Sequence, residues 1–183
     1  MPHFHIPLQS GCDEVLKLMH RHYDRDLFAH KIERIKQLMP HCFIGVDVMV
    51  GTRGEKDEYF EDSYQFIKGL DVTQLHVFSY SERPGTKALL IDYVVPPQVK
   101  HERSQRLLEL SDEKTHAFYQ RFVGQEMPVL LEKSKAGQPM HGFTPNYIRV
   151  EVENHPELDN HIVMVSLGEM NEAGDALKGR ILL

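Results

Sequence analysis

The sequence predicts an α/β protein in which a parallel sheet with helices is followed by a small all-β domain. Apolar strand-like runs alternate with helical stretches in the first half of the chain, which is the order of right-handed βαβ units. After residue 124, short β-type segments follow one another without helices, and Gly, Pro and Asn turns divide them. A long polar helix separates the two patterns. We therefore expect one domain at residues 1–122 and a second at residues 123–183.

The expected elements of the first domain are a strand at 5–8, helices at 13–23 and 24–39, a strand at 42–51, a helix at 55–69, a strand at 74–80 and a helix at 98–122. The helix at 24–39 repeats Phe28, Ile32 and Ile35 at helical spacing, and Pro40 ends it. The run CFIGVDVMVG is apolar and rich in β-branched residues, as is typical of a buried parallel strand. Three strands are too few for a closed barrel of this kind.

The second domain is predicted from four short segments with strand character. They are residues 127–134, 146–153, 161–168 and 177–183. Repeated strands without intervening helices indicate a small antiparallel barrel or sandwich.

The composition is that of a globular protein without a broad basic surface. The chain has 183 residues, of which 41% are hydrophobic and 26% charged, and its net charge is −6 with neutral histidines. Residues 1–120 carry 15 Lys and Arg against 18 Asp and Glu, and residues 121–183 carry 6 against 9. Any contact with nucleic acid must therefore be local.

Targeting signals and cysteine frameworks are not visible in the sequence. No apolar run reaches the roughly 18 residues that a membrane span needs, and the first residues do not form a secretory signal. The two cysteines, Cys12 and Cys42, are too few for a disulfide framework or a cysteine metal site. We expect a cytoplasmic protein with no membrane partner.

Polar or glycine-bearing residues follow each of the three expected parallel strands. These segments are Gln9–Gly11, Gly51–Glu55 and Ser79–Arg83. Since the carboxyl ends of parallel strands meet at one edge, the three segments can form a cradle for a polar small molecule. The alternative is that they are ordinary polar loops between strands and helices.

Asp47 is unusual because it lies within an otherwise apolar strand. A lone buried carboxylate is unfavourable, so Asp47 either faces a polar cavity or has a fixed structural partner. His3 and His5 have the spacing of two metal ligands on one face of a strand, but no Cys or carboxylate cluster completes the set. We therefore expect no metal site.

Several motifs in order resemble the radical S-adenosylmethionine methylthiotransferases. They are HIPLQSG, DEVLK-x-M with R-x-Y, DVMVG-x-x-GE, FSYS-x-RPGT and, in the second domain, GFTPNYIRVE. Enzymes of this family add a methylthio group to a tRNA adenosine or to a ribosomal-protein aspartate. The residues of the last two motifs resemble most the branch that acts on N6-threonylcarbamoyladenosine at position 37 of tRNA.

The resemblance implies a fold and a set of cofactors. Residues 1–122 are expected to form the last three strands of a radical-SAM (β/α) barrel and a linking helix, and residues 123–183 a TRAM domain, a small OB-like RNA-binding β-barrel. The complete enzyme would use S-adenosylmethionine and two [4Fe-4S] clusters, whose cysteine ligands are absent from this chain. We expect the C-terminal part of a larger enzyme, inactive by itself.

The implied activity is addition of a methylthio group to C2 of N6-threonylcarbamoyladenosine 37. Two alternatives stay open. The first is the branch that modifies a ribosomal-protein aspartate, and the second is an RNA-binding module without catalysis.

The resemblance also assigns residues to the S-adenosylmethionine site. They are Gln9, Ser10, Arg21, Asp47, Gly51, Phe78, Tyr80 and Arg83. Gln9 and Ser10 would hydrogen-bond the cofactor, Arg21 would pair with its carboxylate, and Gly51 would let the backbone approach it. The alternative for Arg21 and Arg83 is a role in bracing the surface loops.

The partner implied for the second domain is the tRNA anticodon stem-loop. Candidate phosphate contacts are Lys133, Lys135, Arg149 and Lys178, and candidate base-stacking residues are Phe143 and Tyr147. The alternative for each lysine is ordinary solvation. An exposed strand edge at residues 4–8 is also expected to favour self-association.

Overall fold

The computed structural model describes residues 1–135 and 137–182, and the chain divides into two compact units. The first, called here the sheet unit, comprises residues 4–40 and 44–114. The second, called the barrel unit, comprises residues 1–3, 41–43 and 115–183. Among the described residues, no helix has the length and apolar character needed to cross a membrane.

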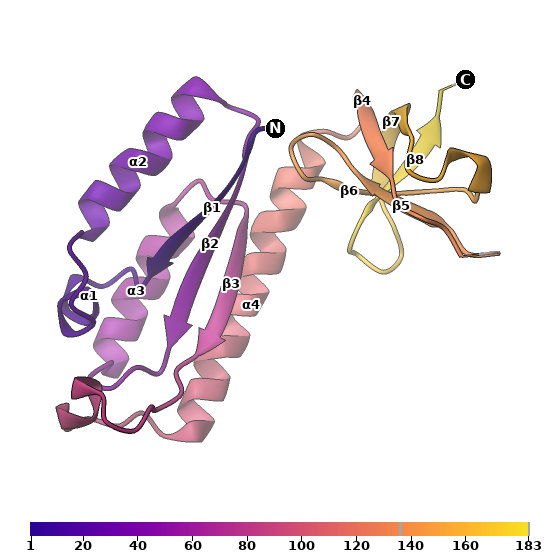
Figure 1. Cartoon of the computed structure of the whole chain (residues 1–183). Coiled ribbons are helices and arrows are strands. Elements are labelled where there is room, and N and C mark those ends of the chain that lie inside the picture. Colours follow the sequence, from indigo (N-terminus) through magenta and orange to yellow (C-terminus); the bar gives the residue numbers. More distant parts are fainter. Residues whose placement is uncertain (136, 183) are drawn as a thin grey trace. The chain divides into compact units, whose positions relative to one another are not determined.

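The sheet unit is built on a three-stranded sheet in the order β1-β2-β3. In chain order the elements are β1 (His3–Gln9), α1 (Asp13–Leu18), α2 (Arg25–Leu38), β2 (Phe43–Val50), α3 (Asp57–Gly69), β3 (Gln74–Ser79), the 3-10 helix η1 (Lys87–Leu90) and α4 (Pro97–Gln120). β2 and β3 pair in parallel, and the three arrows point the same way in Figure 1. The predicted α/β arrangement with three parallel strands is confirmed.

The sheet has one face covered by helices and one face without them. Along β2, Val46, Val48 and Val50 are at most 1% exposed, whereas Asp47 and Met49, which alternate with them, are partly exposed. Figure 1 shows α3 and α4 behind the strands and no described helix in front of them. Because successive side chains of a strand point to opposite faces, one row of each strand packs on the helices and the other faces outward.

The helix α1 ends at Leu18, earlier than the predicted end at residue 23. The chain turns at His20, whose φ is 54°, and the Tyr23 hydroxyl donates to the carbonyl of Leu8 at 2.8 Å. A new helix then begins behind Asp24, whose carboxylate accepts from the Leu27 amide at 2.8 Å. The contact between Tyr23 and β1 therefore accompanies a turn at residues that were predicted to end the first helix.

The barrel unit contains a closed five-stranded barrel in the order β4-β5-β6-β8-β7. Its elements are β4 (Glu126–Leu131), β5 (Met140–Phe143), β6 (Arg149–Val152), the 3-10 helix η2 (Pro156–Leu158), β7 (Ile162–Met170) and β8 (Leu177–Ile181). All pairs are antiparallel except β6 with β8, which is parallel. The barrel is thus mostly antiparallel, as predicted, but it has a fifth strand, β5, that the sequence did not reveal.

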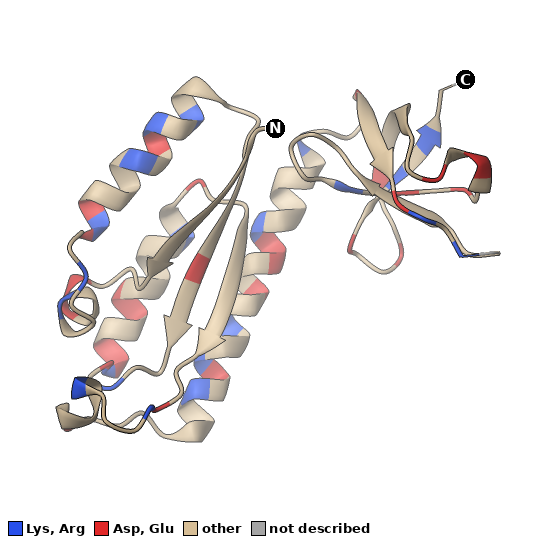
Figure 2. Cartoon of the chain, viewed as in Figure 1, with Lys and Arg blue, Asp and Glu red and all other residues tan. Residues whose placement is uncertain are grey.

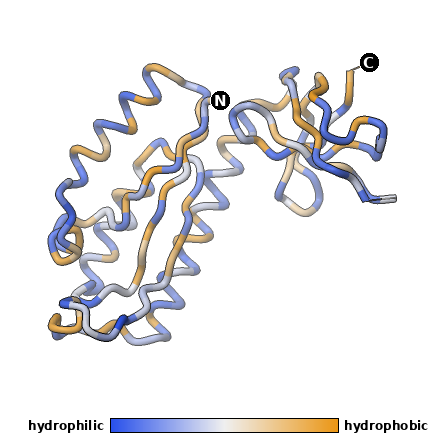
Figure 3. The backbone as a smooth tube through the Cα atoms, viewed as in Figure 1, coloured by the Kyte–Doolittle hydropathy of each residue, from blue (hydrophilic) through white to orange (hydrophobic). Residues whose placement is uncertain are grey.

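The interior of the barrel is apolar and includes the end of α4. Val129, Leu131 and Ile148 are fully buried, and Phe118 and Phe122 of the helical segment join the same cluster. At Gly142 a Cβ would lie 2.4 Å from the Leu130 carbonyl oxygen. Only glycine fits this close approach of β5 to β4, which explains why so short and glycine-containing a segment forms a strand. Figure 3 shows the hydrophobic residues along the strands of both units.

Candidate functional site

The carboxyl ends of β1, β2 and β3 lie at the same edge of the sheet, as their parallel order requires. β2 and β3 end together, since Val50 pairs with Ser79 and the Tyr80 amide donates to the Val50 carbonyl at 2.8 Å. The three polar segments predicted to cradle a ligand therefore follow neighbouring strands. This edge is the usual place for a ligand in open α/β sheets.

The turn after β1 is tightly fixed and has an unusual backbone. Gln9 is 9% exposed and has a φ of 71°, a left-handed conformation that is uncommon for residues other than glycine. Ser10 is 1% exposed, and its hydroxyl accepts from the Cys12 amide at 3.2 Å. The Gly11 amide donates to the Ser63 hydroxyl at 2.8 Å. Such strain is found where the surrounding structure holds a functional loop in place.

The loop after β2 is held by a buried ion pair that the sequence reasoning missed. Glu55 is 2% exposed, and its carboxylate accepts from the Gly51 amide at 2.7 Å and from the Arg103 guanidinium at 2.7 Å. Arg103 also donates to the Asp57 carboxylate at 2.5 Å. Burial raises the pKa of Glu55, and the Gly51 amide and Arg103 oppose that rise. Glu55 and Arg103 are 48 residues apart, so no local pattern marks the pair.

The side chain of Lys100 lies beside Gly51. The φ of Gly51 is 72°, and a Cβ placed there would lie 2.3 Å from Cγ of Lys100. The Lys100 stem crosses Gly51, and its ammonium donates to the Tyr80 carbonyl at 3.3 Å. A lysine from α4 therefore occupies the space beside this glycine. No sequence signal marked Lys100.

Thr52, next to Gly51, offers a free hydrogen-bonding group at this edge. It is 5% exposed, and within residues 1–135 and 137–182 its Oγ1 is the only buried side-chain N or O atom without a hydrogen-bond partner. Buried polar atoms without a partner are rare in native proteins and call for a ligand, a water or an ion. With the polar turn at Gln9 and Ser10, Thr52 makes this edge chemically suitable for a polar cofactor such as S-adenosylmethionine.

The other residues assigned to the cofactor are more dispersed. Arg21 and Arg83 are exposed, and Phe78, at the end of β3, is 51% exposed. Asp47 is bonded to His5, with 2.5 Å between Oδ1 and Nε2. It thus has a fixed partner and lies in the outward-facing row of β2. Figure 2 shows acidic and basic residues mainly on the helices of this unit, and little charge along its strands. The roles of all these residues in binding stay predictions.

A pocket of about 550 Å³ lies beside the carboxyl edge. Segments that follow each of the three strands line it, with Leu18 after β1, Tyr59 of α3 after β2, and Ile91 after β3. Its lining includes none of the predicted cofactor residues. It adds an apolar recess to the polar edge.

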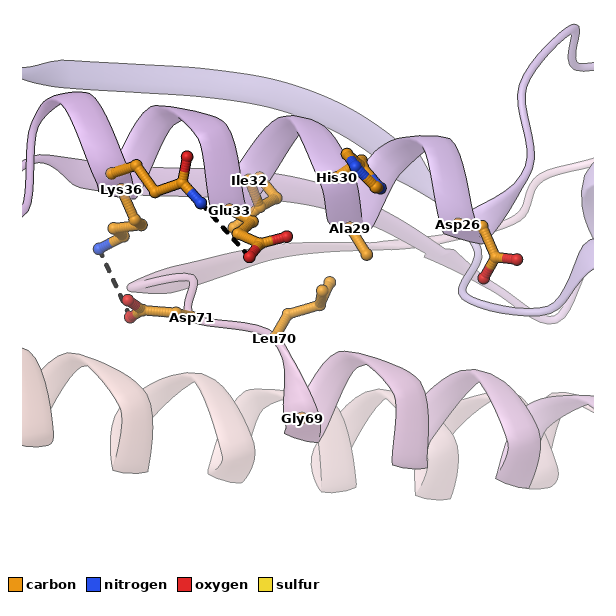
Figure 4. A pocket seen from close by; sticks show the side chains of 10 residues that line it. Asp26, Ala29, His30, Ile32, Glu33, Lys36, Gly69, Leu70 and Asp71 are labelled. Atoms are coloured by element: carbon orange, nitrogen blue, oxygen red, sulfur yellow. Dashed lines mark hydrogen bonds and ion pairs between the residues drawn. The ribbon is translucent and has the colours of Figure 1, made fainter.

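A larger groove of about 740 Å³ lies between α2 and the segment that follows α3 (Figure 4). Lys36 of α2 pairs with Asp71 there at 3.5 Å, and Gln37 bonds Glu33 at 3.4 Å. Residues 69–71 precede β3, so the groove lies toward the amino ends of the strands. That end of a parallel α/β fold usually serves stability, and we do not assign the groove to the site.

The residues present do not fit an iron-sulfur cluster. Cys12 and Cys42 are both buried and lie 30 positions apart in the sequence. Burial raises the pKa of the Cys12 thiol to about 11, so the thiolate that a metal needs is disfavoured. Among the described residues, the one group of three possible metal ligands is Cys12, Glu14 and Asp62, two of which are exposed. The chain supplies no cysteine set for a cluster.

In the barrel unit, three of the six predicted RNA contacts come together. The rings of Phe143 and Tyr147 stack with centroids 4.8 Å apart, and Arg149 is the cross-strand partner of Phe143. Lys178 of β8 lies next to Glu151 of β6 in the register of the two strands. Glu151 is two residues beyond Arg149, on the same side of β6. Lys133 and Lys135 lie in the exposed segment after β4. The face formed by β5, β6 and β8 therefore carries aromatic and basic side chains.

Tyr147 has a backbone conformation that its side chain disfavours. Its φ is 67°, and the ring is 39% exposed. The Tyr147 amide donates to the Thr144 carbonyl at 3.0 Å, and the Thr144 hydroxyl bonds Asn146 at 2.7 Å within the same turn. A left-handed conformation at a bulky residue is a strained position, and such strain is concentrated at binding sites.

Acidic groups compete for the basic residues of this face. Arg149 forms an ion pair with Asp175, and His141 lies 3.3 Å from the Glu151 carboxylate. Hydrogen bonding from Asn171 lowers the pKa of Asp175, which keeps the carboxylate charged. Asp175 therefore offsets part of the positive charge of Arg149 on this face. The sequence reasoning missed His141 and Asp175.

Comparison with known proteins shows what the chain is similar to. Residues 1–67, which include β1, β2 and the loop after β2, match the Radical SAM superfamily. The chain is also similar to tRNA-modifying enzymes. It is 36% identical to the threonylcarbamoyladenosine tRNA methylthiotransferase MtaB of Aquifex aeolicus over 86% of the chain, and 34% identical to the protein of that name from Bacillus subtilis over 90%.

A third relative is named for a different adenosine substrate. The tRNA-2-methylthio-N(6)-dimethylallyladenosine synthase of Syntrophotalea carbinolica is 37% identical over 90% of the chain. The chain spans 37% or 38% of the length of these three relatives. The chain is thus similar to tRNA methylthiotransferases whose names give two different modified adenosines.

Proposed function

We propose that this chain works as part of a radical SAM tRNA methylthiotransferase, as the portion that holds one side of the cofactor and contacts the RNA. The observation that carries the proposal is the extent of the similarity. Matches to tRNA methylthiotransferases cover 86% to 90% of the chain, and so they include residues of both units. A radical SAM match confined to the sheet unit would have left the RNA partner without support.

In this proposal the carboxyl edge of the sheet binds S-adenosylmethionine. Gln9, Ser10 and Thr52 offer polar groups there, and the bond from the Gly51 amide to Glu55 keeps the loop in one conformation. Arg103 holds Glu55 and so positions that loop indirectly. When bound and reductively cleaved, the cofactor supplies a radical that abstracts hydrogen, and the residues of this chain bind, orient and shield it.

The barrel face with Phe143, Tyr147 and Arg149 is proposed to hold the tRNA anticodon stem-loop. The rings of Phe143 and Tyr147, with His3 also 4.3 Å from Tyr147 between ring centroids, form an aromatic cluster of the kind on which unpaired bases stack. The neighbouring guanidinium of Arg149 suits the phosphate backbone. The contact must be local, because residues 121–183 carry more acidic than basic side chains. We propose N6-threonylcarbamoyladenosine 37 as the substrate, with C2 as the position that receives the methylthio group.

Nucleoside analysis tests the function and its finer substrate. The gene encoding this chain is deleted, tRNA is digested to nucleosides, and the products are compared by mass spectrometry with those of the parent and a complemented strain. We expect loss of 2-methylthio-N6-threonylcarbamoyladenosine and accumulation of the form without the methylthio group. Loss of the dimethylallyl product instead would contradict the substrate, and loss of a methylthio-aspartate in a ribosomal protein would favour that branch. An unchanged profile of all three products would leave only an RNA-binding role.

A further inference from the structure

The uncovered face of the sheet carries a cluster with one polar side chain from each strand. His5 comes from β1, Asp47 from β2 and His76 from β3. Nε2 of His5 lies 2.5 Å from Oδ1 of Asp47, and the rings of His5 and His76 stack with centroids 4.4 Å apart and planes 23° from parallel. Asp47 and His76 are also direct neighbours in the register of β2 with β3. The three side chains therefore form one group in the middle of the sheet.

The backbone of β2 leaves room for this arrangement. Gly45 lies two residues before Asp47 on the same side of the strand. A Cβ at Gly45 would lie 3.2 Å from Nε2 of His76, closer than ordinary contact. Glycine at this position thus lets the His76 ring extend from β3 across β2 toward His5. The ring position is determined by packing as well as by stacking.

The hydrogen bond to Asp47 determines which nitrogen of His5 can act as an acceptor. An ionised carboxylate only accepts, so Nε2 of His5 must donate its proton to Asp47. In the neutral ring, Nδ1 then has a free lone pair. The His5 side chain is 48% exposed, so about half of its surface is accessible to a ligand. Burial lowers the pKa of His76, which favours a neutral ring beside His5.

An aromatic ring lies near the cluster on the same face. Phe78 follows His76 by two residues on β3, and its 51% exposure leaves the ring uncovered. Two residues of a strand span about 6.6 Å, which is within the length of one nucleoside. A hydrogen-bond acceptor beside an open aromatic ring matches a ligand that has both a donor group and a flat base.

We propose that His5, oriented by Asp47 and supported by His76, accepts a hydrogen bond from a hydroxyl or N–H group of a bound nucleoside. The proposal rests on the function proposed above, in which both the cofactor and the RNA substrate contain an adenosine. Asp47 is then a positioning residue, because it acts through the tautomer of His5. Phe78 packs against the base of the same ligand.

The first test measures the tautomer in the chain itself. Long-range ¹H–¹⁵N spectra of histidine-labelled protein at pH 7.5 are expected to show His5 protonated at Nε2 and unprotonated at Nδ1. In Asp47→Asn this preference should weaken, whereas Met49→Leu, on the same face and without a hydrogen-bonding group, should leave it unchanged. A His5 ring protonated at Nδ1 alone in the unsubstituted chain would overturn the proposal.

The second test measures binding in the methylthiotransferase that contains this chain. His5→Phe keeps an aromatic ring on His76 but removes the acceptor, and it is expected to weaken ligand binding about tenfold, the effect of one lost hydrogen bond. A higher Kd for S-adenosylmethionine identifies the nucleoside of the cofactor as the ligand. A higher KM for tRNA with an unchanged Kd for the cofactor identifies the nucleoside of the substrate. His101→Gln, at an exposed histidine of α4, serves as the control.

Asp47→Asn provides a second variant should His5→Phe fold poorly, and it is expected to change the same constant by a smaller factor. Unchanged cofactor and tRNA constants in both folded variants would refute the role of His5. If the unsubstituted enzyme transfers no methylthio group to tRNA, the proposed function fails, while the tautomer measurement still decides whether the His5 acceptor exists.

Discussion

The two faces of the sheet use the same three strands and differ in what they carry. The covered face is apolar, with Leu8, Val48 and Leu75 at 0%, 1% and 4% exposure. The uncovered face alternates with it and carries His5, Asp47, His76 and Phe78. Burial of apolar area is the main favourable contribution to folding, so the covered face should determine stability. The uncovered face can then hold polar groups at little cost to the fold.

The largest effect is expected where the covered side includes a charge. Arg103 is 3% exposed and neutralises the buried Glu55, so Arg103→Met should lower the free energy of unfolding by about 3–5 kcal/mol. Arg106, on the same helix, bonds Glu61 at 2.8 Å but is largely solvated, and Arg106→Met should cost less than about 1 kcal/mol. Urea denaturation of both variants measures the difference. Equal losses would show that Glu55 does not depend on its buried partner.

A smaller loss of stability is expected along β3, where one residue from each face of the sheet can be compared. Leu75→Ala removes a side chain that is 4% exposed on the covered face, and we expect a loss of about 2–5 kcal/mol in the free energy of unfolding. Phe78 is larger but 51% exposed, so Phe78→Ala should cost less than about 1 kcal/mol. Thermal and urea unfolding report both values. The comparison between faces would be wrong if Phe78→Ala proved the more destabilising change.

Regular patterns made much of the fold predictable from the sequence. The alternation of strands with helices gave the parallel order, and parallel order places the ends of the strands at one edge. Asp47 within an apolar strand correctly marked an unusual position. Its partner could not be predicted, because His5 is 42 residues away and the bond depends on the register of β1 against β2.

The elements that were missed depend on contacts between distant residues. The strand β5 has four residues and forms because Gly142 permits a close approach to β4. Helix α1 ends early next to the bond between Tyr23 and β1. The pair of Glu55 with Arg103 joins a loop to a helix across 48 residues. Local periodicity contains no information about such contacts.

The smallest effect is the pH dependence that His76 contributes on the uncovered face. Burial lowers the pKa of His76 below its ordinary value of 6.5, the nearby His5 lowers it further, and Asp47 opposes them. The unfolded chain therefore binds more protons than the folded chain as the pH falls through 6.5. Stability that is fully present above that pH is lost below it, until the folded-state pKa of His76 is passed.

His76→Gln removes this titration, so its free energy of unfolding should decrease less than that of the unsubstituted chain between pH 7.5 and pH 5. The control is Leu75→Ala, the preceding residue on the opposite face, which should lower stability by the same amount at both pH values because it changes no titrating group. Urea denaturation gives the difference in free energy of unfolding between each variant and the unsubstituted chain at each of the two pH values. Parallel pH curves for His76→Gln and the unsubstituted chain would show that His76 is not sufficiently buried beside His5 to resist protonation. The uncovered face would then lack the neutral His76 ring that is proposed to support His5 as an acceptor.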